Sequence, residues 1–293
     1  ALVLYGLSRG PEDGWTAANT LGSLFAGAAL FVVLVFIELR DRFPMLDLRL
    51  FADRMFRNAN LFMFVAISGL MGVLFVLPLY LQELRGISAL DSGLTTFPQA
   101  IGMIAIVQFS TRLYTRIGPR RMMIPGMLGL AVTTAAFMLV GLHTDLWWIR
   151  GLMFARGLTL GIAMVPMQTA TFATIKSQDT GRASALMNTN RQVGGSFGVA
   201  ILATILSERA ASHVPAAVAA AAQQGNRIAQ AAAARGTLFA YHDVFFAAAL
   251  LSLVGMAFAF LIHDEDAAAT MRQKPVITEH PAAPAAEVEA LVH

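Results

Sequence analysis

Seven stretches of about twenty apolar residues each dominate this sequence and constrain its fold more than any other feature. An α-helix rises roughly 1.5 Å per residue and the hydrocarbon core of a bilayer is about 30 Å thick, so each stretch is long enough to cross a membrane. The stretches cover residues 21–37, 59–81, 93–114, 122–142, 146–170, 183–206 and 244–262. The sequence therefore predicts an all-α integral membrane protein.

The composition supports this class and excludes several functions. Hydrophobic residues make up 57% of the chain and charged residues 13%, whereas about a quarter of the residues in soluble domains are charged. The chain has no cysteine, which excludes disulfides, thiolate metal sites and cysteine nucleophiles. The net charge of +3 is small and lies mostly in loops, so we expect no nucleic-acid partner. We also expect no metal and no other cofactor.

The basic residues predict how the chain is oriented. Segments on the cytoplasmic side of a membrane carry more Lys and Arg than those on the other side. Alternate segments of this chain hold thirteen and five such residues. The richer set comprises Arg40, Arg42, Arg49, Arg54, Arg57, Arg112, Arg116, Arg120, Arg121, Lys176, Arg182, Arg272 and Lys274. We therefore expect a multi-pass protein of the cell (inner) membrane with these segments and the C-terminus in the cytoplasm.

Three further segments do not span the membrane. The apolar stub 1–7 runs into a polar loop, so we interpret it as the end of a truncated helix and expect a missing N-terminal half. The segment 209–240 is alanine-rich, and it is predicted to be either a loose surface helix or disordered. The tail 264–293 lacks the apolar residues that folding requires and is predicted to be disordered.

Polar side chains are confined to some of the predicted helices. The spans 21–37, 122–142 and 244–262 contain no charged or amide side chain and can face lipid. Three other spans carry amides and arginines, which must face protein or a water-filled cavity. The residues that we expect to line a substrate pathway are Arg156, Asn188, Arg191, Gln192, Gln99, Gln108 and Gln168.

Some of these residues also allow a structural interpretation. Arg156 lies about ten residues into its span, roughly 15 Å deep. At that depth it either meets substrate, water or a carboxylate of the missing half, or bonds the carbonyls of a neighbouring helix. A second set of small residues has the four-residue spacing that favours close helix packing. This set comprises Gly157, Gly161, Gly194 and Gly198.

The last six spans form two triplets with the same order of polar content. Each triplet opens with a helix that carries a late proline, Pro78 in the first and Pro166 in the second. Because each triplet has an odd number of spans, the second is inverted in the membrane relative to the first. Inverted three-helix repeats are the building plan of many secondary transporters.

Short motifs lie along these spans in a distinctive order. They are PMLDLRLF at 44–51, LPLYLQ at 77–82, Ser92-Gly93 with Pro98, Arg156-Gly157 with Gly161 and Pro166, and GRASAL at 181–186 followed by Asn188, Arg191-Gln192 and Gly194-Gly195. In these motifs and their order the chain resembles the major facilitator superfamily, and more narrowly the fourteen-helix drug:proton antiporters of the EmrB/QacA type. The resemblance implies that the spans are helices eight to fourteen of such a protein.

The resemblance also implies a division of the chain. Residues 1–58 would hold the end of a truncated helix, one extra span and a cytoplasmic linker, residues 59–263 the C-terminal six-helix transporter domain, and residues 264–293 a cytoplasmic tail. One motif departs from the family pattern, because Thr111 replaces the glycine and Thr115 the aspartate of the superfamily loop signature. We therefore assign no gating ion pair to Thr115.

An enzymatic function has one motif in its favour. Residues 194–198 read GGSFG, which matches the G-x-S-x-G pattern of hydrolases. That pattern requires a strand-turn-helix setting and a histidine base. Here it lies inside an apolar span, and the histidines lie at span ends, in loops or in the tail. We therefore expect no catalysis.

Transport is the function that these features favour. The resemblance implies the C-terminal portion of a proton-coupled multidrug efflux transporter that works by alternating access. Its partners would be small amphipathic or cationic drugs, protons, the lipid bilayer, the missing N-terminal half and, in some such systems, a periplasmic adaptor protein. The alternatives are an exporter of another small metabolite and a non-transporting membrane assembly or sensor domain.

Overall fold

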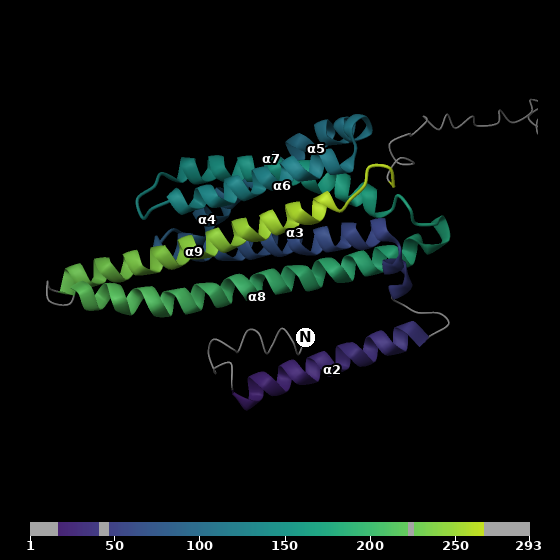
Figure 1. The fold of residues 1–293 in the computed structure, drawn as a ribbon. Coiled ribbons are helices and arrows are strands. Elements are labelled where there is room, and N and C mark those ends of the chain that lie inside the picture. Colours follow the sequence, from purple (N-terminus) through teal and green to yellow (C-terminus); the bar gives the residue numbers. More distant parts are fainter. Residues whose placement is uncertain (1–16, 41–46, 222–225, 267–293) are drawn as a thin grey trace, which may run out of the picture.

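The computed structural model describes residues 17–40, 47–221 and 226–266 (Figure 1). Seven helical segments within these ranges are long and apolar enough to cross a membrane. The elements are α2 (Ala18–Arg40), η1 (Leu48–Ala52), α3 (Arg54–Leu79), η2 (Tyr80–Leu84), α4 (Ala89–Thr96), α5 (Pro98–Ile117), α6 (Pro119–Ala135), η3 (Ala136–Leu139), α7 (Leu146–Thr171), η4 (Ser177–Asp179), α8 (Thr180–Ala221) and α9 (Asn226–Phe260). The predicted all-α membrane fold is confirmed, whereas the stub 1–7 and most of the tail lie outside the described residues.

Prolines shape two of the predicted spans. The span 93–114 is divided into α4 and α5 at Phe97, because the proline ring of Pro98 crowds the residue before it and Pro98 has no N–H for a helical hydrogen bond. Pro78 lies within α3, and the helix continues after it as the π-helical turn η2. A π-turn accommodates the hydrogen bonds that a proline disturbs.

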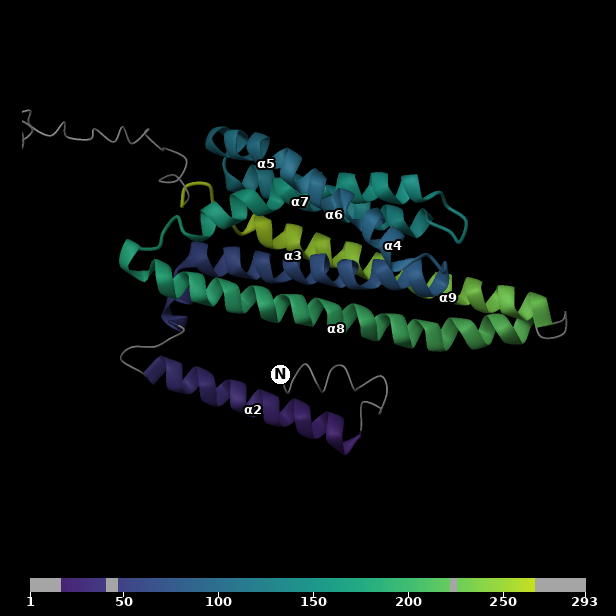
Figure 2. The same cartoon turned by 180° about the vertical axis from the view of Figure 1, so that it is seen from behind.

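The segment 209–240 differs from the expected loose helix or disorder. Its described residues continue α8 and α9 without a break, and the two helices pack on each other. Figures 1 and 2 show this hairpin continuing past the ends of the other helices. A backbone carbonyl of His213 lies 2.9 Å from the position that a Cβ on Gly236 would occupy, so the two helices are in close contact there.

The six helical segments after α2 form two related triplets, and most of the packing joins a helix of one triplet to a helix of the other. Helix α3 packs on α8 as α7 packs on α5, and α9 packs on α3 as α6 packs on α7. Helices α6 and α9, which correspond to each other in the two triplets, also contact each other. Each of these contacts is thus matched by a contact between the corresponding helices of the other triplet, as a pseudo-twofold axis between inverted repeats requires. The α8–α9 hairpin is the main departure from this symmetry.

Side-chain hydrogen bonds join the arginine-rich ends of the bundle. Thr174, which follows α7, donates its hydroxyl to Asp53 Oδ1 at 2.8 Å. The same oxygen accepts the backbone N–H of Phe56 at 2.7 Å and so caps the start of α3. At the start of α6, the N–H of Arg120 donates to Asp264 Oδ1 at 2.9 Å. Nη2 of Arg54, the first residue of α3, also lies 3.0 Å from Asp266 Oδ2, so the ends of α3, α6, α7 and α9 meet at one level.

The opposite end of the bundle is joined by hydrogen bonds to the loop between η3 and α7. The hydroxyl of Tyr80 donates to the carbonyl of Gly141 at 2.8 Å. Arg85 Nη2 donates to the carbonyl of Thr144 at 2.7 Å. These contacts fix the end of α3 against the loop. Helix α2, by contrast, lies apart from the bundle (Figure 2), and most of its side chains are exposed.

Candidate substrate pathway

Helix α8 presents a polar face at the middle depth of the bundle. Asn188, Arg191 and Gln192 are all exposed in the structure. Arg191 lies about 16 Å along the axis from the start of α8, at roughly 1.5 Å per residue, near the middle of a hydrocarbon core of about 30 Å. Charged and amide groups at that depth must face protein or water rather than lipid. This face of α8 is therefore unsuited to direct contact with lipid.

Two of the predicted pathway residues meet at a cavity beside this face. Gln168 of α7 and Arg191 of α8 both line it, and α3 and α5 complete its wall. The cavity has a volume of about 60 Å³. This volume has room for ordered water, whereas sites for drug-sized molecules measure about 300–1,000 Å³. The cavity is thus a part of a wall and not a complete drug site.

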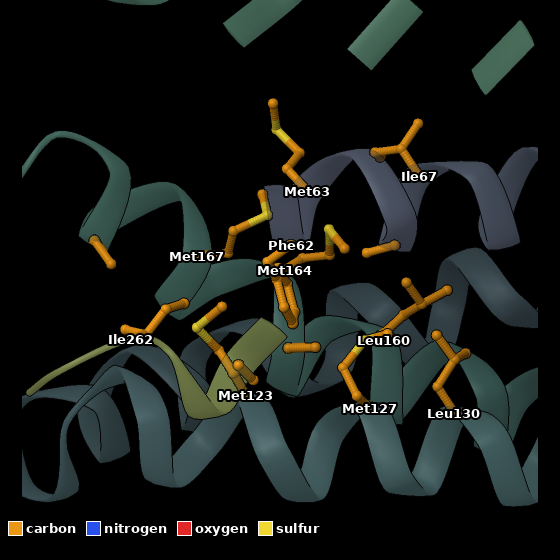
Figure 3. Packing of buried hydrophobic residues seen from close by; sticks show 14 of the residues in the cluster. Phe62, Met63, Ile67, Met123, Met127, Leu130, Leu160, Met164, Met167 and Ile262 are labelled. Atoms are coloured by element: carbon orange, nitrogen blue, oxygen red, sulfur yellow. The ribbon is translucent and has the colours of Figure 1, made fainter. Parts of the chain in front are cut away.

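Methionine supplies most of the apolar wall of this cavity. The five methionines that line it are Met63, Met103, Met164, Met167 and Met187. Figure 3 shows three of them, Met63, Met164 and Met167, which also belong to the buried apolar cluster between α3, α6 and α7. Methionine is unbranched and polarizable, so its side chain adapts to ligands of different shape. The wall can therefore accommodate varied apolar groups.

Arg156 is placed differently from the exposed polar residues. Its side chain is 1% exposed and lies between four helices. It donates from Nη1 to Gln99 Oε1 at 2.6 Å, from Nη2 to the carbonyl of Gly69 at 3.3 Å and from Nε to Thr134 Oγ1 at 3.3 Å. All three acceptors are neutral. The structure therefore brings two predicted pathway residues, Arg156 and Gln99, together inside the bundle, away from the cavity.

The remaining predicted residues lie on α5 and at helix contacts. Gln108 is exposed on α5 and does not line the cavity described above. A Cβ on Gly157 would lie 2.1 Å from the carbonyl oxygen of Gln99, and one on Gly198 would lie 2.0 Å from that of Ser68. Real Cβ atoms do not approach other atoms so closely, so a larger residue at either position would force the helices apart. Positions 161 and 194 are similarly close to neighbouring helices.

The sequence did not reveal several polar contacts between helices. Asn190 Nδ2 donates to the carbonyl of Asn60 at 2.8 Å and to its Oδ1 at 3.2 Å, joining α8 to α3. Ser68 donates its hydroxyl to the carbonyl of Gly194 at 2.7 Å in the same interface. The one sequence feature that pointed to these contacts is the amide of Asn60, which lies near the start of a predicted span. Thr134 was missed because a lone threonine in a membrane helix is common.

Comparison with known proteins identifies the family. A model described as Major Facilitator Superfamily matches residues 2–199. An uncharacterized MFS-type transporter, YcnB of Bacillus subtilis, is 31% identical over 260 residues, which is 89% of this chain and 52% of the relative. The multidrug resistance protein B homolog of Mycobacterium tuberculosis is 31% identical over 211 residues, 71% of this chain and 39% of the relative. The lincomycin resistance protein LmrB of Listeria monocytogenes is 29% identical over 207 residues, 70% of this chain and 44% of the relative.

These relatives confirm the predicted resemblance to the drug-efflux type of transporter. The chain spans between about two fifths and one half of the length of each relative. The matched region of the family model covers all of α2 to α7 and the polar face of α8. On the evidence of the helical fold, the matched model and these relatives, the chain belongs to the major facilitator superfamily.

Proposed function

We propose that this chain is the C-terminal portion of a proton-coupled multidrug exporter, in which residues 59–263 form one of two six-helix domains. The observation that carries the proposal is the exposed polar face of α8 at the middle depth of the membrane. Such a face needs a protein partner or a water-filled cavity. A second domain opposite α8, with a cavity between the two, would supply both. The names of the drug-resistance relatives favour drugs as the cargo.

In this proposal the methionine cavity is one wall of the drug site. Arg191 and Gln168 provide donors that orient a bound molecule, and the methionines contact its apolar part. Few fixed polar contacts and an adaptable apolar wall are typical of promiscuous binding. We therefore expect amphipathic drugs of varied shape to contact this wall.

Arg156 would keep the domain rigid while it moves. Its hydrogen bonds join α7 to α3, α5 and α6, and alternating access is largely a rocking of such units about a fixed site. A buried charge is costly to leave without hydrogen-bond partners. The network would therefore resist separation of these four helices during the cycle.

Proton coupling would rely on a carboxylate outside the spans described here. The acidic residues in the described helices lie at the ends of the bundle, such as Glu83, Asp91 and Asp243. We propose that the coupling acid belongs to the N-terminal half, together with the second wall of the drug site. The arginine-rich end of the bundle would face the cytoplasm.

Substitutions on α8 in the complete transporter test this proposal. Arg191→Ala should reduce dye efflux from cells by about tenfold, the loss expected for one charge-assisted hydrogen bond. Val193→Ala is the matched control, because Val193 is also exposed on α8 and is apolar. Efflux should be measured at equal amounts of protein in the membrane. Unchanged efflux of every dye by the Arg191 variant would contradict a pathway at this face.

A further inference from the structure

An amphipathic groove lies between α8 and α9, near the base of their hairpin extension. It has a volume of about 340 Å³. Ile205, Glu208 and Arg209 of α8 line it together with Asp243, Phe246 and Leu250 of α9. We refer to these six residues as the α8–α9 groove. It is separate from the methionine cavity, with which it shares no lining residue.

The α8–α9 groove is polar at one end and apolar at the other. The two helices are antiparallel, so Glu208 and Arg209 on α8 lie toward the hairpin end, as Asp243 does on α9. Arg209 Nε lies 3.4 Å from Asp243 Oδ2 across this rim, and His213 Nε2 lies 3.0 Å from the same oxygen. Leu250 is seven residues further along α9, about 10 Å deeper in the bundle. The groove thus changes from charged to apolar over roughly the depth of a lipid head-group region and the first part of an acyl chain.

A hydrogen bond fixes the level of the charged rim. His242, next to Asp243, bonds the carbonyl of Val140 through Nε2 at 2.9 Å. Val140 lies directly after η3, where the chain leaves one transmembrane segment and turns toward α7. Trp147 and Trp148, at the start of α7, are both exposed, as is typical of aromatic residues at a membrane surface. The charged rim therefore lies level with the surface of the membrane.

The apolar part of the groove lies chiefly on α9. Helical residues advance by about 100° each, which places Glu208 about 160° around α8 from Asn188 and Gln192. Arg209, by the same rule, lies in line with Arg191. Phe246 and Leu250 are 49% and 45% exposed. Helix α9 has no charged or amide side chain between Asp243 and its end at Phe260. This side of the hairpin is thus suited to lipid.

We propose that the α8–α9 groove binds a phospholipid with a primary ammonium head group, such as phosphatidylethanolamine, from the leaflet at the hairpin end. The guanidinium of Arg209, whose side chain is 57% exposed, bonds the phosphate, and the carboxylate of Glu208 accepts an N–H bond from the ammonium. The acyl chain lies along Phe246 and Leu250. A choline head group has no N–H to donate, and a glycerol head group has no cation, so the rim discriminates against both. The inference requires a membrane-embedded chain and does not depend on what is transported.

Lipid retention by the purified complete transporter tests this inference. The protein in mild detergent is incubated with the dioleoyl form of phosphatidylethanolamine, phosphatidylcholine or phosphatidylglycerol, and bound lipid is counted by native mass spectrometry. Phosphatidylethanolamine should be retained about tenfold more than the other two lipids, the ratio expected for one additional charge-assisted hydrogen bond. Equal retention of the three lipids would show an unselective contact and overturn the inference.

Two variants locate the site. Glu208→Gln should reduce the preference for phosphatidylethanolamine at least fivefold while the retention of phosphatidylcholine stays unchanged. Leu250→Trp should fill the apolar part and reduce the retention of phosphatidylethanolamine. Arg235→Gln is the control, because Arg235 is exposed on α9 outside the groove. An undiminished preference in Glu208→Gln, or an equal loss in Arg235→Gln, would place the lipid elsewhere and overturn the assignment.

Discussion

Alanine at position 157 is expected to separate α5 from α7. The added Cβ would lie 2.1 Å from the carbonyl oxygen of Gln99 and 3.0 Å from the backbone nitrogen of Met103, whereas favourable contacts begin near 3.5 Å. The helices must move apart by about 1 Å, and overpacking of this kind costs about 1–3 kcal/mol. Gln99 is also the nearest partner of Arg156, and the loss of that charge-assisted bond costs roughly 1.5–3 kcal/mol more. We expect a total destabilisation of about 2.5–6 kcal/mol.

Gly151 on the same helix is the matched control. A Cβ there meets nothing within 4 Å, and alanine in place of glycine in a helix interior stabilises it by up to about 1 kcal/mol. Thermal unfolding of the purified complete transporter, followed by fluorescence-detected size exclusion, compares the two variants. Gly157→Ala should unfold at a lower temperature than the unsubstituted protein, and Gly151→Ala at the same or a higher temperature. If Gly157→Ala unfolds at the same temperature as Gly151→Ala, α5 and α7 do not pack closely at this position.

Three further predictions concern stability and topology. Arg156→Ala should lower the amount of folded protein, because three buried acceptors lose their donor at about 1–3 kcal/mol each. Arg150→Ala is the control and should leave that amount unchanged, because it removes only a guanidinium stacked on an exposed tryptophan ring. Equal yields of the two variants would contradict the structural role of Arg156. Asp53→Ala should destabilise the protein by about 1–2 kcal/mol, measured in the same unfolding assay, because α3 loses its N-cap; an unchanged unfolding temperature would show that the cap contributes little. In intact cells, a cysteine at Arg116 should resist a membrane-impermeant thiol reagent while one at Ser212 reacts, and the reverse pattern would invert the proposed orientation.

The fold could be predicted largely from the sequence because the length and apolar character of a span are local properties. Burial is not a local property, and Arg156 illustrates the difference. Its depth followed from counting residues along one helix, but its enclosure depends on Gln99 and Thr134, which belong to two other helices. Gln99 and Gln168 appeared equivalent in the sequence, yet one is buried against an arginine and the other lines a cavity.

The methionine wall was not predicted for a related reason. Its five residues come from four helices, and no short stretch of sequence shows them together. The length of the α8–α9 hairpin was also uncertain from the sequence, because alanine-rich segments such as 209–240 lack the apolar stripe that identifies a packed helix. Close contact between the two helices, as at Gly236, provides the stabilisation that the sequence pattern does not reveal.

The proposed drug:proton antiport is tested most directly in vesicles with an imposed proton gradient. The complete transporter, reconstituted without other proteins, should move a fluorescent amphipathic dye against the direction of proton flow, and a protonophore should abolish the movement. Residues 1–293 alone should give no such transport, because alternating access requires two domains around a central site. Proton-independent behaviour of the complete protein with every dye, or robust proton-driven efflux from vesicles that contain residues 1–293 alone, would contradict the account.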